Sequence, residues 1–243
     1  MLHLSLLAAS LLAAAGPAAP AAPPASPSSD VARTALPSES ALQAQIPRAS
    51  HAALAASLAA WRRAVASGAA LRADVLTVID YTRPSTEPRL FVIDVLRSRV
   101  RFAELVAHGR DSGGNAASRF SNAGGSHMSS LGVFRAADVY RGEHGLSLHL
   151  DGLEPGFNDH ARDRAIVIHG ARYVSTEIAA VLGRLGRSWG CPAVRPSVAN
   201  RLIDTIKDGS VVVAYYPDAD WLARSAFLAR TVTASAPPAA DPS

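Results

Sequence analysis

The spacing of apolar residues changes near residue 71, from a helical period to the short runs that are typical of strands. Within 47–67, apolar side chains recur at intervals of four, three and four, which places them on one face of a helix. They are Leu54, Leu58, Trp61 and Val65. Gly68 then supplies a stop signal. The pattern predicts a helical segment over 47–70 that packs on the domain after it.

Seven short runs rich in Val, Ile, Leu and Phe follow, and turn residues separate them. Such runs predict β-strands, here at 75–79, 90–95, 100–106, 131–134, 146–150, 165–169 and 210–216. One helix, 197–207, is predicted between the last two strands, because Pro196 opens it and Gly209 lies just past its end. We therefore expect a mainly β domain over 71–217, followed by a short helix and a disordered Pro/Ala-rich tail over 218–243.

The first 46 residues have a different character. An apolar run followed by small residues over 1–22 predicts a signal peptide or a short anchor. The run is too short for a stable membrane span, which needs about 20 apolar residues. A Pro/Ala/Ser-rich stretch over 23–46 predicts an extended linker. These features predict export, with the protein located in the periplasm or the cell envelope.

The amino-acid composition argues against several classes of function. A hydrophobic fraction of 49% with 18% charged residues is that of a globular protein. The formal charge of +4 comes almost entirely from arginine, but no basic run with interleaved aromatics is present, so we expect no nucleic-acid partner. The histidines lack H-E-x-x-H and Cys/His zinc spacing, so neither a metal nor another cofactor is predicted. His108 and His127 lie in glycine-rich stretches and are candidates to line a cleft.

The one cysteine, Cys191, lies in a turn bounded by glycines, Gly186 to Pro192. A lone cysteine is often a small buried hydrophobic residue, but a thiol beside a base is a nucleophile. His169, at the end of a predicted strand, is the natural base. The backbone N–H groups of Gly190 and Cys191 are candidates to face the oxyanion that forms when a thiol attacks a carbonyl. The pattern points to acyl transfer through a thioester.

These residues resemble a known family. His169-Gly170 followed by Ser188-Trp189-Gly190-Cys191 is similar to the signature of the YkuD-type L,D-transpeptidases. Further stretches resemble a divergent branch, the murein L,D-transpeptidase catalytic-domain family, and the match covers 71–216. These stretches are 106–109, 129–132, 144–148, 156–159 and 184–192.

The resemblance implies a β-sandwich-like fold in which the cysteine and the histidine share a cleft. Cys191 would attack a peptidoglycan stem tetrapeptide at its diamino-acid carbonyl, release D-alanine, and pass the acyl group to a second stem as a 3→3 cross-link. His169 would be the general base, oriented by the carbonyl of Gly170, and Ser188 would shape the site. The resemblance also implies covalent inhibition by carbapenems.

Three departures from the family pattern concern the substrate. Trp189 stands where a second histidine is common, and Ala193 where Asn or Arg often follows. The His-to-Ser separation is also slightly long. Arg195 is a substitute candidate for binding a carboxylate, and Arg187, Trp189 and Tyr173 are candidate substrate contacts.

Three alternatives remain open. One is an L,D-carboxypeptidase, which would trim the terminal D-alanine by using water as the acceptor. The others are a non-catalytic module that binds the cell wall and a thiol protease that acts on ordinary protein.

Overall fold

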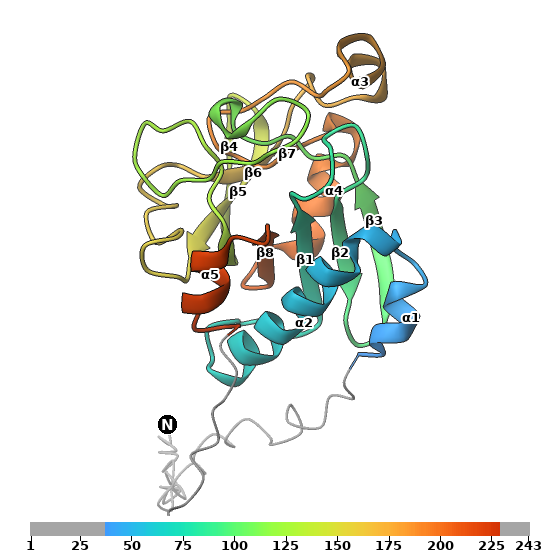
Figure 1. Ribbon diagram of the computed structural model, residues 1–243, viewed down its shortest axis with the longest axis vertical. Coiled ribbons are helices and arrows are strands. Elements are labelled where there is room, and N and C mark those ends of the chain that lie inside the picture. Colours follow the sequence, from blue (N-terminus) through green and yellow to red (C-terminus); the bar gives the residue numbers. More distant parts are fainter. Residues whose placement is uncertain (1–36, 229–243) are drawn as a thin grey trace, which may run out of the picture. The chain divides into compact units, whose positions relative to one another are not determined.

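Strands from the two ends of the domain meet in the middle of one sheet, where β1 (Val75–Asp80) pairs in parallel with β8 (Val211–Tyr215). The computed structural model describes residues 37–228, and its eight strands follow the order β3-β2-β1-β8-β4-β5-β6-β7 (Figure 1). The other strands are β2 (Leu90–Asp94), β3 (Arg99–Glu104), β4 (Gly132–Gly142), β5 (Gly145–Gly152), β6 (Val167–Gly170) and β7 (Ala193–Val194).

Both faces of the sheet are covered around β1, and every residue of this strand is buried. Leu76 and Val78 belong to one apolar cluster and Val75 and Ile79 to another, because successive side chains point to opposite faces. A strand covered on both faces needs a continuous apolar run instead of an alternating one. This is the pattern that the sequence has over 75–79.

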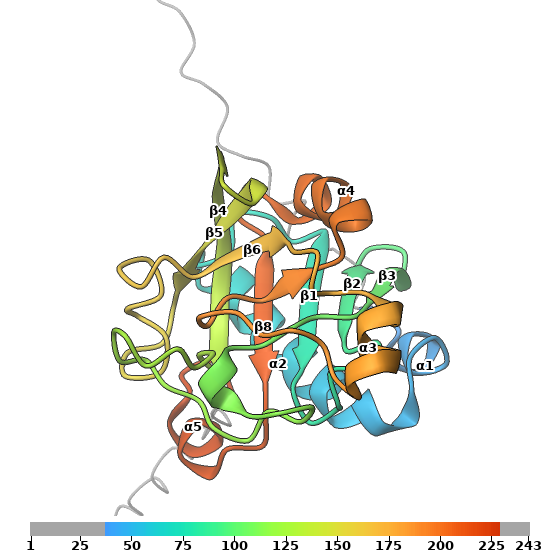
Figure 2. The same ribbon diagram turned by 90° about the horizontal axis from the view of Figure 1, so that it is seen from above.

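Helices supply the cover. On one face α2 (His51–Ala66) packs on β1 and β8, and its buried residues include Leu54, Leu58 and Trp61. On the other face α4 (Pro196–Ile206) packs on β6, β5 and β1 (Figure 2). The remaining helices are α1 (Glu39–Gln43), α3 (Thr176–Leu182) and α5 (Ala219–Arg224), with 3-10 turns at Arg48–Ser50 and Arg110–Ser112.

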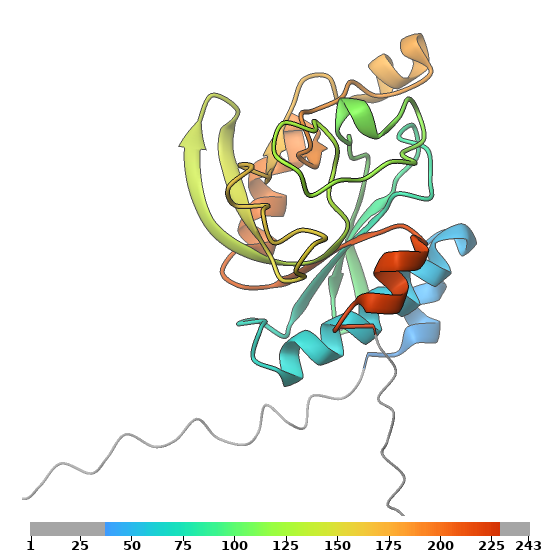
Figure 3. The same ribbon diagram turned by 60° about the vertical axis from the view of Figure 1, so that its left-hand side comes forward.

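The β4–β5 hairpin is the longest element of the sheet, and it curves visibly in Figure 3. Its register shifts between Ala136 and Val139, which marks a β-bulge. A bulge bends the strand that carries it and increases the local twist. The hairpin tip, residues 142–145, consequently reaches the side of the sheet where β6 ends, as the cavity shared by its residues and His169 shows.

The mainly β fold, the packed N-terminal helix and the helix after the cysteine turn are confirmed, and all seven predicted strands are present, six of them within a few residues of their expected bounds. The exception is the strand predicted over 131–134, because β4 continues to Gly142 as one arm of the long hairpin. The strands are hydrogen-bonded into one continuous sheet. Among the strands and α-helices of 71–217, β7 and α3 were not predicted. β7 has only two residues, and α3 buries no side chain, so neither leaves a pattern of apolar positions.

The linker prediction over 23–46 is wrong for its last residues. Ser38 caps α1 by accepting a hydrogen bond from the Ala41 N–H, and Leu42 and Ile46 are buried in the cluster under α2. The Ser/Ala-rich sequence does not predict this short helix, because only two apolar side chains pack it against the domain. The predicted signal peptide, the linker before residue 37 and the tail after residue 228 lie outside the described residues. Within 37–228 no helix combines the length and apolarity needed to cross a membrane.

Candidate active site

The parallel pairing of β6 with β7 brings the histidine and the cysteine together. His169 lies opposite Ala193, and Cys191 precedes Ala193 by two residues, so the cysteine turn ends beside the strand that carries His169. Cys191 and His169 both line one cleft of about 480 Å³. The other lining residues are Tyr140, Glu143, His144, Arg164, Ala165, Val167, Tyr173, Arg187, Ser188 and Trp189.

Cys191 is partly exposed at the floor of this cleft. Its Sγ lies 3.5 Å from the carbonyl oxygen of Ala165, to which the thiol donates. Burial raises the pKa of the thiol, while the Val167 backbone, the Arg164 guanidinium and the N–H of Cys191 itself act in the opposite direction. The thiol is therefore protonated at rest and needs a base to become a nucleophile.

His169 is the predicted base, and it lines the same cleft as Cys191. Its Nδ1 lies 3.0 Å from the carbonyl oxygen of Gly170, the contact that the sequence resemblance implies. Because a carbonyl oxygen only accepts, Nδ1 carries the proton and Nε2 is left as the basic atom. Burial lowers the pKa of His169, the Gly170 carbonyl raises it, and His144 lowers it. The imidazole is therefore neutral near pH 7 and ready to accept a proton at Nε2.

The cysteine turn is held by its own hydrogen bonds. Ser188 Oγ accepts from the Gly190 N–H at 3.1 Å and donates to the Cys191 carbonyl at 2.6 Å. Ser129 Oγ donates to the Gly190 carbonyl at 2.9 Å. Gly190 has a φ of +130°, and a Cβ there would lie 2.9 Å from the Met128 carbonyl oxygen. Both the conformation and the close approach require glycine.

These bonds correct one expectation. The Gly190 N–H does not face the cleft as an oxyanion donor, because Ser188 Oγ already accepts its hydrogen bond. The N–H of Cys191 has no hydrogen-bond acceptor on another residue within 37–228, and it lies beside its own thiol. Of the two backbone donors considered, Cys191 alone is available.

A second segment supports the turn from behind. Ser188 N–H donates to the His108 carbonyl at 3.0 Å, Arg110 N–H donates to the Ser188 carbonyl at 2.8 Å, and Ala107 N–H donates to the Ala193 carbonyl at 2.8 Å. Residues 107–110 therefore run beside the whole length of the cysteine turn.

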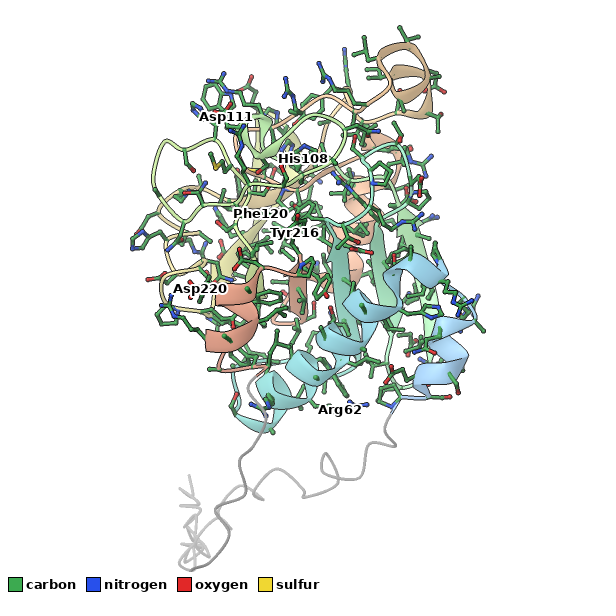
Figure 4. The ribbon with its side chains drawn as sticks, in the orientation of Figure 1. Arg62, His108, Asp111, Phe120, Tyr216 and Asp220 are labelled. Atoms are coloured by element: carbon green, nitrogen blue, oxygen red, sulfur yellow. The ribbon has the colours of Figure 1, made fainter. Side chains whose placement is uncertain are left out.

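His108 itself is buried beneath this segment and does not line the cleft. Its ring lies edge-on to Tyr81, which packs on Phe120, and Phe120 packs on Tyr216. Figure 4 shows His108, Phe120 and Tyr216 grouped in the middle of the molecule. Arg89 is fully buried next to it and donates to His108 Nδ1 at 2.7 Å. His108 is thus part of the support, whereas His127 lines a neighbouring cavity of about 390 Å³ and packs against Trp189, with ring centroids 5.2 Å apart and ring planes tilted by 43°.

The remaining predicted residues divide into two groups. Trp189 is 72% exposed at the rim of the cleft, and Tyr173 lines its wall with a pKa that burial raises to about 12. Arg187 lines the cleft and also donates to the carbonyls of Arg110 and Gly113. Arg195 does not line the cleft, because its guanidinium pairs with Glu104 at 2.6 Å.

Gly170 contributes through its carbonyl and through its lack of a side chain. A Cβ there would lie 3.1 Å from the Cβ of Ala199 and 3.3 Å from the Cα of Pro196. Glycine therefore lets α4 pack closely against the end of the strand that carries His169.

Sequence reasoning missed several residues that line the cleft, and two of them contact groups that hold the site. Arg164 donates four hydrogen bonds to the loop 121–130 and lies on both the cleft and the neighbouring cavity. Its position just before the predicted strand of His169 was the available signal. His144 stacks on His169 with ring centroids 4.5 Å apart. Only the pairing of β5 with β6 reveals this contact.

The side chains of the cleft limit the chemistry that the site can perform. Within 37–228 no group of three or more His, Cys, Asp or Glu side chains is arranged to hold a metal ion. A protonated thiol and a neutral imidazole share a cleft in a mainly β domain, an arrangement suited to nucleophilic acyl transfer. The fold and the site are therefore compatible with an acyl-transfer domain. The chain belongs to the L,D-transpeptidase catalytic domain family, whose model matches residues 45–215.

Solved structures that resemble the chain have low sequence identity to it. They include the L,D-transpeptidase from Mycobacterium smegmatis, at 14% identity with a TM-score of 0.37, covering 59% of this chain and 59% of that one. A second is the L,D-transpeptidase of Xylanimonas cellulosilytica, at 17% identity with a TM-score of 0.34, covering 63% and 68%. The helical cell shape determining protein Pgp2 from Campylobacter jejuni, as its K307A mutant, has 13% identity and a TM-score of 0.39, covering 58% and 46%.

The chain thus spans 59% of the length of the first of these proteins. No curated protein matches the chain.

Proposed function

We propose that the protein is an L,D-transpeptidase of the cell envelope that joins peptidoglycan stem peptides through a thioester on Cys191. The observation that carries this proposal is the shared cleft, in which the chain's one cysteine and a buried histidine with a free Nε2 are placed together. Family membership supplies the substrate class. The export expected from the N-terminal sequence supplies the location.

The acylation step begins when the donor stem places its diamino-acid carbonyl carbon against Sγ. His169 Nε2 takes the thiol proton as the S–C bond forms, and the carbonyl oxygen becomes an oxyanion. The Cys191 N–H is the backbone donor we assign to that oxyanion. The amide C–N bond then breaks, His169 returns the proton to the leaving amine of D-alanine, and the thioester remains.

The second step regenerates the thiol. The side-chain amine of an acceptor stem attacks the thioester carbonyl and loses a proton to His169 Nε2. The C–S bond breaks, the thiolate is reprotonated, and a 3→3 amide bond between two diamino acids is formed. If water attacks instead, the same acyl-enzyme yields an L,D-carboxypeptidase product.

The electrostatics of the cleft fit a base that acts only when substrate is present. The thiol and the imidazole are both neutral at rest, so no reactive thiolate is exposed to solvent before the substrate arrives. The Arg164 charge stabilises the thiolate as it forms. Ser188 and Ser129 keep the turn in place while the charge develops.

Substrate contacts are assigned from the cleft lining. We propose that the exposed Trp189 and the Tyr173 ring form apolar walls for the stem peptide, and that Arg187 provides a positive charge at the rim. Arg195 is not included, because Glu104 neutralises it outside the cleft.

Intact mass spectrometry with a carbapenem tests the nucleophile. The wild type should gain one covalent adduct that maps to Cys191, and Cys191→Ala should gain none. A folded wild type that neither forms the adduct nor turns over a disaccharide-tetrapeptide would contradict the proposal. Supplying the tetrapeptide with and without a second stem separates the two products, because a cross-linked dimer indicates transpeptidation and a tripeptide alone indicates carboxypeptidation.

A further inference from the structure

The tip of the β4–β5 hairpin contacts His169, the proposed general base. Ser147 on β5 pairs with His169 on β6, and His144 lies three residues before Ser147, in the tip. The imidazole of His144 stacks on that of His169, with centroids 4.5 Å apart and ring planes inclined by 23°. The tip also separates two hollows, since Glu143 and His144 line both the cleft and a second cavity of about 450 Å³.

The hydrogen bond from Nδ1 to the Gly170 carbonyl fixes one atom of the His169 ring. A single bond at Nδ1 leaves the ring free to tilt about the side-chain torsions, and tilting moves Nε2 away from the thiol. A second ring stacked on its face opposes that tilt, because stacked aromatic rings attract each other beyond the gain from burying their area. Hydrogen bond and stack together define the ring plane.

We propose that His144 is a positioning residue for His169, which holds the imidazole with Nε2 directed toward Cys191. This inference rests on the proposed function for its effect on catalysis, but not for its effect on the imidazole itself. His144 does not have to touch the reacting atoms. It acts through the ring on which it stacks.

The electrostatic effect of His144 on His169 supports the same role as the stacking contact. His144 lowers the pKa of His169, as does burial, and so favours the neutral form that the base requires. The other titratable or charged side chains around the cleft are Tyr140, Glu143, Arg164, Tyr173, Arg187 and Cys191. The pKa shift at His169 comes from burial, the Gly170 carbonyl and His144, and not from these six side chains.

The same hairpin offers a matched control. His149 on β5 stacks on Tyr140 with nearly the same geometry, 4.6 Å and 21°, and its Nδ1 lies 2.9 Å from Asp138. His149 does not line the cleft. Replacing it therefore removes a stacked histidine from the hairpin without removing the ring that faces His169.

The test uses the full chain carrying His144→Ala, His144→Phe or His149→Ala, with two readouts. Long-range proton–nitrogen NMR of the imidazoles reports the tautomer and the titration of His169 without any substrate. Initial rates of acyl transfer from a disaccharide-tetrapeptide across pH report kcat and KM.

For His144→Ala we expect a mixed tautomer at His169, a titration midpoint shifted to higher pH, and kcat lowered by about tenfold, since misplacing a base weakens proton transfer. His144→Phe restores a ring without a charge. It should recover the single tautomer and most of the lost kcat while the midpoint stays raised. His149→Ala should match the wild type in both readouts.

An unchanged tautomer, titration midpoint and kcat in a folded His144→Ala would overturn the inference. Equal losses in His149→Ala would do so too, since the effect would then belong to hairpin stability. If neither the wild type nor any variant turns over substrate while the NMR differences persist, the proposed function fails and the positioning role stands.

Discussion

Arg89 and His108, both buried, are joined by a hydrogen bond of 2.7 Å in which the guanidinium donates to Nδ1. The imidazole must accept at Nδ1, so its proton sits on Nε2, which lies 3.4 Å from the Gly113 carbonyl. Burial and the adjacent guanidinium lower the pKa of His108 to about 4. The carbonyl of the same residue holds the cysteine turn through Ser188. His108, whose imidazole must stay neutral, thus supports the cysteine turn.

The contact between Arg89 and His108 predicts that the protein loses stability as the pH falls. The pKa of His108 is about 4 when folded and 6.5 as its ordinary value, so the unfolded chain binds the extra proton first as the pH falls. The stability is fully present above pH 6.5 and is lost progressively down to pH 4, by about 3 kcal/mol in total. Urea unfolding at pH 7 and pH 4.5 measures the loss. His108→Gln should flatten the pH dependence, and the exposed His160→Gln should leave it unaltered.

The fall of kcat/KM at low pH should report the pKa of His169. Burial lowers the pKa of this base, so kcat/KM should stay on its plateau below pH 6.5 and fall only as the pH drops through the lowered pKa. The pH profile of acyl transfer from the tetrapeptide measures this limb. A midpoint above 6.5 would mean that the imidazole is not held in its buried, neutral form.

Arg164 should influence the thiol by its charge and the loop 121–130 by its hydrogen bonds. Arg164→Gln removes the charge that lowers the pKa of Cys191, so iodoacetamide should alkylate the thiol more slowly at any given pH. Arg164→Lys keeps a charge but cannot make the four bonds to the loop. It should therefore keep a faster alkylation rate than Arg164→Gln. Equal rates in the two variants would assign the effect to the loop alone.

Gly190→Ala should damage the site more than the fold. The new Cβ would lie 2.9 Å from the Met128 carbonyl oxygen, at a φ of +130° that side chains avoid, so the turn must shift. A displacement of about 1 Å at a reacting atom lowers rates by about hundredfold. Gly183→Ala is the control, because Gly183 also has a positive φ but open space around it. Carbapenem acylation rates should fall in the first variant and be retained in the second.

Glu154 should matter for stability. This buried carboxylate accepts from the Val133 N–H at 2.7 Å, from Trp221 Nε1 at 2.8 Å and from Ser225 Oγ, and so ties α5 to the sheet. Glu154→Leu leaves three buried donors without an acceptor, each costing about 1–3 kcal/mol. We expect the free energy of unfolding to fall by at least about 3 kcal/mol in urea titrations. The exposed Glu87→Leu should change it by less than about 0.5 kcal/mol.

The strands and the large helices could be predicted because each leaves a regular pattern of apolar positions. The residues made His169 a candidate partner of Cys191, but only the family resemblance implied that the two share a cleft, since the pairing of β6 with β7 rests on a two-residue strand. The partner of Arg195 was out of reach, because Glu104 lies 91 positions away on β3. The contact between His144 and His169 depends on hairpin register and curvature, which local sequence does not encode.

The segment between His169 and Cys191 contains α3, which buries no side chain and leaves Val181 82% exposed. The distance from His169 to Cys191 is therefore set by strand pairing and not by the number of residues in between. Lengthening a loop costs only about 0.6 kcal/mol for each doubling, so insertions here are cheap. The spacing can therefore grow without moving the two residues, so an engineer could place a tag or a small domain at α3 while keeping His169 and Cys191 together.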